Sequence, residues 1–329
     1  MNAFRPVWIH PSLRAQAQAR KRLESLQRGE IDHGFHYLGL KQSELWLTVH
    51  RRYAPLFADP SFVEIFRAIS AQTAAGLAGR AVHVIGLGPG GGGKEAGLLQ
   101  ALQSAGCKLR YTPVDASLEL ALLSAEAAEP FVETEIQPLA GDLSLLDELP
   151  QWLERYPVEE IRVYTAFGLT PNFLPSQIFP WLSGLLREQD VLLLSANLAP
   201  GGDESEEAYH AACGKILPQY DNPETEAWLR QILVDWGISP LLGEPCFQIQ
   251  AIEGLLGFVA HCPWLADVSF PWEGQPFSAR HGERLRLFFS LRYTPGRLVS
   301  ALRAYGLGLG PGQVTACGQE GVWRVGRAG

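Results

Sequence analysis

The chain has 329 residues, 47% of them hydrophobic, and a formal net charge of −8 at pH 7. This length and composition allow a sizeable core, in one large domain or in two intertwined lobes. Acidic and basic residues are mixed along the chain, which argues against the basic face of a nucleic-acid-binding protein, so we expect no nucleic-acid partner.

Cysteine usage and hydropathy indicate the compartment. The five cysteines show neither CxxC nor Cys/His metal spacing, which favours reduced thiols over a disulfide framework and predicts no metal site. We find no apolar signal core at the N-terminus and no apolar run of the roughly 18 residues that a membrane span requires. We therefore expect a soluble, cytoplasmic protein with no membrane partner. The oligomeric state stays open.

The first half of the chain changes from helices to an alternating pattern. Helices are predicted at 12–28 and 60–77. Short apolar or β-branched runs then alternate with segments long enough for helices; the runs lie at 81–87, 108–114, 132–138, 160–166 and 190–196, and the helical segments at 94–105, 117–127, 143–155 and 174–187. This alternation predicts a doubly wound α/β fold, in which helices cover both faces of a parallel sheet.

After Asn197 the alternation stops. The segment 204–236 is predicted to be mainly helical, and 240–275 mixes short runs with Pro, Gly and Trp. A β-like run (285–293), a helix (295–305) and a final strand (322–327) follow. We interpret 61–197 as a Rossmann-like core, 198–284 as an inserted lobe and 285–329 as C-terminal strands that return to the core sheet, while 1–60 joins the second lobe.

A glycine-rich turn, VIGLGPGGGGK, occupies residues 84–94, directly after the first strand of the alternating region and before a helix. Glycines let the backbone turn sharply and approach a ligand closely. The N-terminus of the following helix offers free N–H groups to a phosphate or carboxylate. Gly86, Gly88 and Gly91 also satisfy GxGxxG, so a dinucleotide enzyme is an alternative.

Two acidic residues follow the next two strands. Asp115 ends the run YTPVD, about 20 residues beyond the turn, where a carboxylate commonly binds ribose hydroxyls. Asp142, in AGDL, is placed to accept from an adenine amino group, although a plain helix N-cap is the alternative. The turn and both acids fall at successive strand ends, along the edge where open α/β sheets bind ligands. The sequence therefore predicts a nucleoside cofactor.

These motifs resemble those of the histidine-specific Nα-methyltransferases of ergothioneine biosynthesis, which trimethylate the amino group of a free amino acid. The resemblance runs from about Phe35 to Arg327. It implies a Rossmann-like methyltransferase (a transferase) that uses S-adenosyl-L-methionine (SAM). Family members have a turn of the form ELGSGxSxKT, and in this chain Gly86 stands in place of the glutamate that opens that turn. The implied cofactor-binding residues are Gly86, Gly88, Gly90, Lys94, Asp115, Asp142 and Leu143.

The resemblance extends to residues that would bind the substrate. The segment FGLTPNF (167–173) is similar to the family's GSTIGNF, which implies that Asn172 holds the amino group or carboxylate of an amino acid. Tyr209 lies at the position of a carboxylate-binding tyrosine, and Tyr53 lies near that of another. The alternative is that these side chains are structural.

The side-chain pocket departs from the family pattern. Where the family has Glu-x-Ser, this chain has Phe288 and Ser290, and Gly254 stands in place of a methionine. Loss of the carboxylate removes the hydrogen bond that would recognise an imidazole N–H. We therefore predict N-methylation of an amino acid, or a small molecule derived from one, with an apolar or aromatic side chain rather than that of histidine.

No residue is predicted to be a dedicated general base, because methyl transfer from a sulfonium mainly requires that two reactants be aligned. Two other functions stay open. One is an NAD(P)-dependent oxidoreductase that uses the same turn, and the other is a non-catalytic SAM-binding protein.

Overall fold

A computed structural model describes residues 6–53, 59–145 and 147–328. Its core is a nine-stranded sheet in which eight strands follow one another side by side and β4 (Glu135–Ile136) pairs with β3. The eight, in spatial order, are β1 (Trp8–Ile9), β5 (Leu139–Ala140), β3 (Lys108–Asp115), β2 (Ala81–Leu87), β6 (Ile161–Ala166), β7 (Val191–Asn197), β14 (Glu320–Arg327) and β13 (Leu307–Val314).

The predicted doubly wound α/β fold is confirmed. The first seven strands of the sheet, counting β4, run parallel, and β14 pairs antiparallel with both β7 and β13. The strand order reverses between β2 and β6, because the chain builds outward from β2 in one direction and then continues from β6 in the other. A crevice at the carboxyl ends of the strands beside such a reversal is where open α/β sheets bind ligands.

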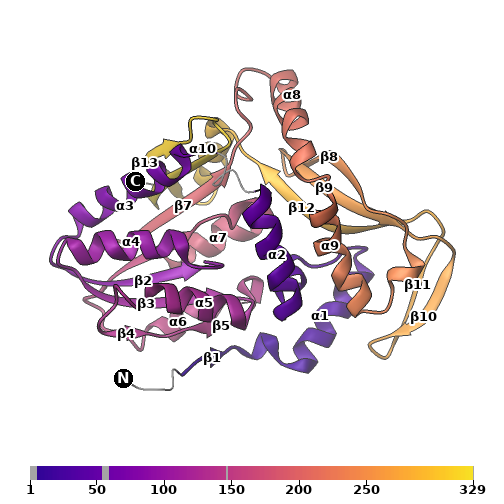
Figure 1. The fold of residues 1–329 in the computed structure, drawn as a ribbon, viewed down its shortest axis with the longest axis horizontal. Helices are drawn as coiled ribbons and strands as arrows, with labels where there is room; N and C mark the ends of the chain where they lie inside the picture. The colour runs from indigo at the N-terminus through magenta and orange to yellow at the C-terminus, as the bar shows by residue number, and fades with distance from the viewer. Residues whose placement is uncertain (1–5, 54–58, 146, 329) are drawn as a thin grey trace.

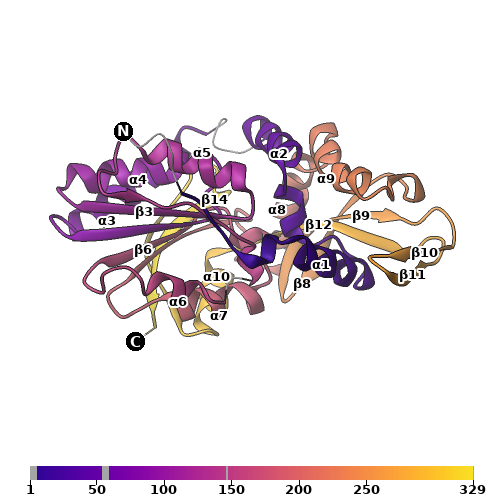
Figure 2. The ribbon, with the colours of Figure 1, turned by 90° about the horizontal axis from the view of Figure 1, so that it is seen from below.

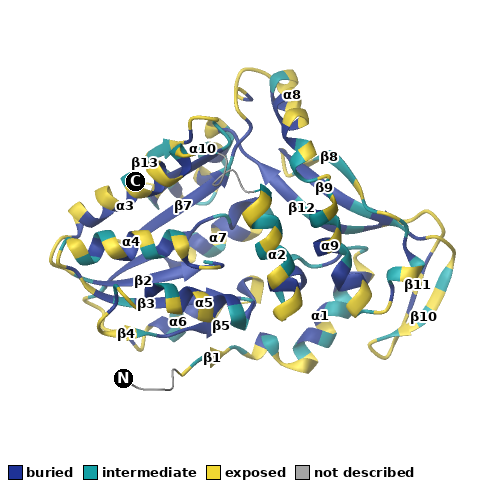
Figure 3. Ribbon diagram, viewed as in Figure 1, coloured by how far each residue is buried: buried dark blue, intermediate teal, exposed yellow. Residues whose placement is uncertain are grey.

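Helices cover both faces of this sheet (Figures 1 and 2). On one face lie α3 (Ser61–Gly76), α4 (Gly93–Ser104) and α5 (Leu118–Ala128), and on the other lie α6 (Leu149–Leu153), α7 (Pro175–Leu185) and α10 (Pro295–Arg303). Alternate residues of β2 enter the two cores: Val82 and Val84 pack on one side, Ile85 and Leu87 on the other. The central strands are therefore buried on both faces, as Figure 3 shows for the sheet.

The second lobe contains a three-stranded antiparallel sheet, β12–β9–β8, formed by β8 (Cys246–Ile252), β9 (Leu255–Pro263) and β12 (Arg284–Arg292). A hairpin of β10 (Val268–Trp272) and β11 (Gln275–Ala279) extends from it. Helices α1 (Ala15–Gln27), α2 (Leu40–Tyr53), α8 (Glu206–Ile216) and α9 (Pro223–Asp235) complete the lobe, and α2 packs against α9.

The boundaries of the lobes differ from the prediction in two places. The run 285–293 is a strand, β12, but it pairs with β9 in the second sheet, so the chain returns to the core sheet only with β13 and β14. Residues 1–60 were expected in the second lobe. Their helices lie there, whereas β1 pairs with β5 at the edge of the core sheet.

Prolines explain why several predicted elements are divided. The strand expected at 132–138 appears as β4 and β5 on either side of Pro138, which has no N–H for a ladder. The helix expected at 204–236 is interrupted by a 3-10 helix (Leu217–Gln219), after which Asn222 caps α9 and Pro223 begins it.

Candidate active site

A cavity of about 1690 Å³ lies at the carboxyl ends of the core strands, where the second lobe faces them. The glycine turn after β2 and the ends of β3 and β5 contribute to its core side. Residues of α1, α2, α9 and β12 contribute to the opposite side, and the 3-10 helix η5 (Thr170–Asn172), which follows β6, also lines it. The predicted ligand-binding edge of the sheet is therefore closed by the second lobe.

The turn requires glycine at three positions. Gly88, Gly90 and Gly92 have φ values of +61°, +57° and +74°, in the left-handed region that other residues rarely adopt. A Cβ on Gly90 would lie 2.7 Å from the indole of Trp46, and one on Gly92 would lie 2.7 Å from the Cα of Ser124. The turn is thus a bare backbone cradle in the cavity wall, and α4 begins directly behind it.

Asp115 lies beside this cradle at the end of β3. Its Oδ2 accepts from the Gly90 N–H at 3.3 Å and its Oδ1 from the Ser117 N–H at 2.9 Å. The carboxyl group is 5% exposed, and burial raises its pKa to about 7. A ribose hydroxyl that donates to this carboxylate would offset part of the desolvation that raises the pKa. The structure thus brings together Gly88, Gly90 and Asp115 as predicted.

Asp142 also lines the cavity, but its carboxylate already has partners. Oδ1 accepts from the backbone N–H of Ser144 at 3.0 Å, and Oδ2 forms an ion pair with Lys21. Lys21 in turn lies 2.6 Å from Asp32. An adenine amino group would therefore have to share an oxygen with Lys21 or Ser144, and the local capping role that was the alternative is present.

The remaining predicted cofactor residues fall in different places. Leu143 lines the cavity, and a Cβ on Gly88 would lie 3.5 Å from its Cδ1. Lys94 also lines it, but its ammonium group is 3.4 Å from Glu320 and lies over the rings of Phe62 and Phe66.

Gly86, by contrast, lies within β2 and is not among the residues that line the cavity. A Cβ there would lie 2.9 Å from the hydroxyl of Tyr111, so an acid would not fit without displacing that ring. A carboxyl group is nevertheless close by: Glu95, in the first turn of α4, accepts from Thr165, which is the strand neighbour of Gly86. Burial raises the pKa of Glu95 to about 7.

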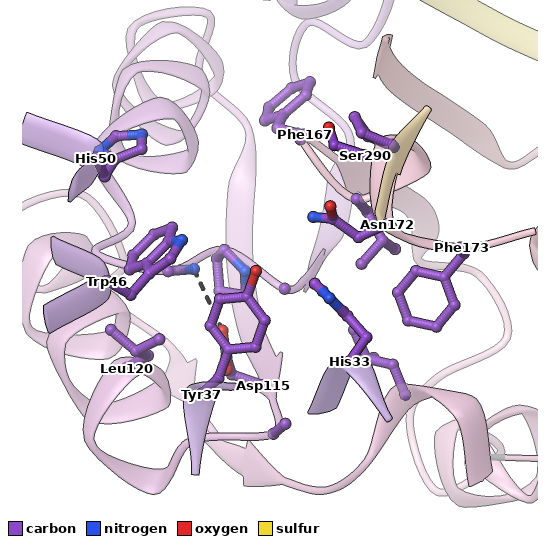
Figure 4. A pocket seen from close by; sticks show the side chains of 18 of the residues that line it. His33, Tyr37, Trp46, His50, Asp115, Leu120, Phe167, Asn172, Phe173 and Ser290 are labelled. Atoms are coloured by element: carbon purple, nitrogen blue, oxygen red, sulfur yellow. Dashed lines mark hydrogen bonds between the residues drawn. The ribbon is translucent and has the colours of Figure 1, made fainter. Parts of the chain in front are cut away.

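Four predicted substrate-binding residues line the cavity. Asn172 lies in η5 with its side-chain amide directed into the cavity (Figure 4), and Phe288 and Ser290 face it from β12. Tyr53, at the end of α2, also lines it and donates to Glu224 at 2.5 Å.

Two other predicted substrate-binding residues, Tyr209 and Gly254, are not among the residues that line this cavity. Tyr209 is 1% exposed; its hydroxyl donates to the carbonyl of Arg292 at 2.5 Å and accepts from the N–H of Leu256 at 2.8 Å, so it joins α8 to the second sheet. Gly254 has φ +77° in the two-residue turn between β8 and β9, where Glu253 is also left-handed. It lines a separate cavity of about 580 Å³.

Aromatic side chains that sequence reasoning missed form much of the wall: His33, Tyr37, Trp46, Phe173, Tyr220 and Trp228. Figure 4 shows His33 and Tyr37 directed into the cavity between Trp46 and Phe173. Burial lowers the pKa of His33 to about 3, so its imidazole is neutral near pH 7. These residues come from segments far apart in the sequence, and no linear motif joins them.

The combination of a glycine cradle, a buried carboxylate and an aromatic chamber suits a nucleoside cofactor that carries a positive centre. Aromatic faces attract cations, and the effect is stronger where water is excluded. The neutral His33 is a poor proton acceptor at a pKa of about 3, so the arrangement favours positioning over acid–base catalysis.

Comparisons with known proteins bear on this interpretation. Residues 62–219 match the family model described as histidine-specific methyltransferase, SAM-dependent. No curated protein sequence gives a significant match. Solved structures that resemble the fold include the CcbJ methyltransferase from Streptomyces caelestis, with 14% identity, a TM-score of 0.39 and coverage of 80% of this chain and 90% of that one.

A second similar structure is the 1,6-didemethyltoxoflavin-N1-methyltransferase of Burkholderia thailandensis, with 13% identity, a TM-score of 0.41 and coverage of 87% and 86% of the two chains. The match to the family model favours SAM over the NAD(P) alternative. It covers the glycine turn, Asp115, Asp142 and Asn172, which are the residues on which the resemblance first rested. The protein is a SAM-dependent methyltransferase, and its residues 62–219 are similar to the histidine-specific methyltransferase family.

Proposed function

We propose that the protein transfers a methyl group from SAM to the amino nitrogen of an amino acid, or of a small molecule derived from one, whose side chain is apolar or aromatic. The observation that carries this proposal is the set of residues that line one cavity. Asn172, a polar group suited to an amine, and the apolar wall around Phe288 line the same cavity as the glycine cradle and Asp115.

The cofactor end of the cavity fits SAM. When bound, SAM supplies a methyl group already activated on a sulfonium. Gly88 and Gly90 leave the backbone bare where a Cβ would contact neighbouring side chains, and the buried Asp115 provides acceptors for ribose hydroxyls. Asp142 and Leu143 line the adjacent wall, in reach of the base in this proposal.

The substrate end selects by shape and apolar contact. Phe288 is 7% exposed and packs edge-to-face on Trp228, with ring centroids 5.6 Å apart, and beside Tyr220 at 6.2 Å. Burial of an apolar side chain against such walls contributes about 25 cal/mol per Å² of apolar area. Phe288 offers no acceptor to an imidazole N–H, so histidine gains less here than an aromatic or aliphatic side chain.

The protein's part in the reaction is to orient the amine. The nitrogen must present a lone pair to the methyl group, and the amide of Asn172 can hold it in that direction by a hydrogen bond. The neutral imidazole of His33 provides no negative charge that would hold the substrate amine as an ammonium ion. Water reaching the cavity mouth carries the released proton away.

Incubation with isotope-labelled SAM and the twenty free amino acids tests the proposal. Mass spectrometry of the products locates the label, and we expect it on the α-amino nitrogen of one or more apolar or aromatic amino acids. Label on oxygen, sulfur or carbon would contradict N-methylation. Binding of S-adenosylhomocysteine without turnover of any amino acid or amino-acid-derived amine would support a non-catalytic SAM-binding protein instead.

A further inference from the structure

Five residues of β12 line the cavity, and three of them stand at every second position: Phe288, Ser290 and Arg292. The other two are Arg286 and Phe289. The strand pairs with β9 without a register shift from Phe288 to Arg292, so the alternation is regular. Phe288 and Ser290 were expected from the sequence. Arg292 was not. It is the second positive charge that β12 contributes to the wall, and the first, Arg286, is already paired with Glu30.

Arg292 is only 3% exposed, which is unusual for a guanidinium. Its Nη2 donates to the hydroxyl of Tyr220 at 2.8 Å, and the group stacks over the rings of Tyr220 and Phe258. Its Nε is buried and has no hydrogen-bond partner, and within the described part of the chain no carboxylate forms an ion pair with it. The aromatic contacts orient the charge without neutralising it.

The two lysines of the cavity wall provide a contrast. Lys21 is paired with Asp32 and Asp142, and Lys94 with Glu320. A buried charge without an opposite partner costs several kcal/mol, so an arginine is rarely kept in that state unless an anion reaches it. The hydroxyls next to Arg292 suit an anion too: Ser290 and Tyr220 lie 3.0 Å apart and either can rotate to donate.

We propose that Arg292, Tyr220 and Ser290 form a carboxylate-binding subsite, so that the substrate is an amine that also carries a carboxylate. The planar guanidinium matches a carboxylate in a two-point contact, which a hydroxyl such as that of the buried Tyr209 cannot make. The proposal rests on the proposed N-methylation and narrows it. The substrate carboxylate binds on β12 and the amine near Asn172, with Ser290 and Asn172 facing the same space (Figure 4).

Calorimetry on the protein saturated with S-adenosylhomocysteine tests the subsite with four probes: L-phenylalanine, L-phenylalaninamide, phenethylamine and 3-phenylpropionate. We expect L-phenylalanine to bind at least 10-fold more tightly than its amide, and 3-phenylpropionate to bind more tightly than phenethylamine. Acid and amide binding within twofold of each other would overturn the proposal, and so would no detectable binding of either carboxylate probe.

Arg292→Gln is the matched variant, because glutamine keeps a hydrogen-bond donor and loses the charge. We expect the acid-to-amide affinity ratio to fall to about 1 while the affinity for S-adenosylhomocysteine stays within twofold; Arg292→Lys should retain part of the ratio. An unchanged ratio in Arg292→Gln would overturn the proposal. If that variant does not fold, Tyr220→Phe removes the hydroxyl that orients the guanidinium, and the acid-to-amide affinity ratio should fall several-fold. An unchanged ratio in Tyr220→Phe would also overturn the proposal.

The two proposals can fail separately. If L-phenylalanine and its amide are N-methylated with equal kcat/KM, N-methylation stands and the subsite fails. If L-phenylalanine binds more tightly than its amide and neither they nor any other amine accepts a methyl group, the subsite stands and the proposed reaction fails.

Discussion

The backbone N–H of Gly90 donates to Oδ2 of Asp115 across 3.3 Å, and this bond joins the glycine turn after β2 to the carboxylate at the end of β3. The two residues are 25 positions apart, yet they form one edge of the cavity. The bond holds the carboxylate beside the bare backbone of the turn. A cofactor bound there would contact both elements at once.

Replacement of Asp115 tests the cofactor site. Asp115→Ala removes the acceptors for ribose hydroxyls and should weaken S-adenosylhomocysteine binding by about 1–3 kcal/mol, measured by calorimetry. Ser117→Ala is the control, since Ser117 caps α5 beside Asp115 without being among the cavity-lining residues. Unchanged affinity in Asp115→Ala would show that the ribose lies elsewhere.

The raised pKa of Asp115 predicts a pH dependence. Folding raises this pKa from 3.8 to about 7, so between those values the apo protein holds a proton that the unfolded chain has released, and stability from this group falls as pH rises through that window. Hydroxyl donors favour the carboxylate, so cofactor binding should release a proton and tighten as pH rises from about 6 to about 8.

Calorimetry in two buffers of different ionisation enthalpy measures that proton release directly. Glu95→Gln removes the other buried carboxyl with a pKa near 7, and the release should persist in it. The proton release should disappear in Asp115→Asn. Binding that weakens with rising pH would contradict the prediction.

Asn172 and Tyr209 should respond differently to substitution. Asn172→Ala should lower kcat/KM about 10-fold or more with little effect on stability, because its amide faces the cavity. Tyr209→Phe should cost about 1–3 kcal/mol of folding free energy, because its hydroxyl makes two buried hydrogen bonds. Denaturant unfolding and steady-state kinetics on both variants separate the roles, and a Tyr209→Phe variant with normal stability and a raised KM would reverse the assignment.

Two glycines with positive φ should also differ. Gly90→Ala should impair cofactor binding, because its Cβ would lie 2.7 Å from Trp46 in the cavity wall. Gly254→Ala has open space around the new Cβ but a φ of +77°, so it should cost about 1–2 kcal/mol of stability and leave kcat/KM unchanged. Thermal unfolding and S-adenosylhomocysteine titration check both, and equal loss of affinity in the two variants would contradict the placement of Gly254.

The sequence predicted the core sheet well because its strands are local apolar runs separated by amphipathic helices. The position of Asp115 followed directly, since the end of a strand fixes which residue reaches the ligand-binding edge. The second lobe was less predictable: α2 has buried polar residues such as Gln42 and Ser43, and β13 contains LGLGPGQV, which does not read as a strand.

Prediction from the sequence was least successful at the candidate active site. Tyr209 and Gly254 were placed by resemblance alone, and the structure puts one inside a helix–sheet contact and the other in a hairpin turn. His33 and Tyr37 could not be found, since they reach the cavity only through the packing of the N-terminal segment. Arg292 could have been predicted from the sequence, because it continues the alternation of Phe288 and Ser290 on one face of a strand.

The most direct test of the proposed specificity compares kcat/KM for histidine with kcat/KM for phenylalanine, tyrosine and tryptophan, measured as S-adenosylhomocysteine release by the full-length protein. Phe288 lines the cavity, and in the proposed binding mode it offers an aromatic face worth about 0.5–1.5 kcal/mol to a stacked ring. We expect at least one of the three aromatic amino acids to exceed histidine about 10-fold or more. Histidine turnover well above that of all three would contradict the account.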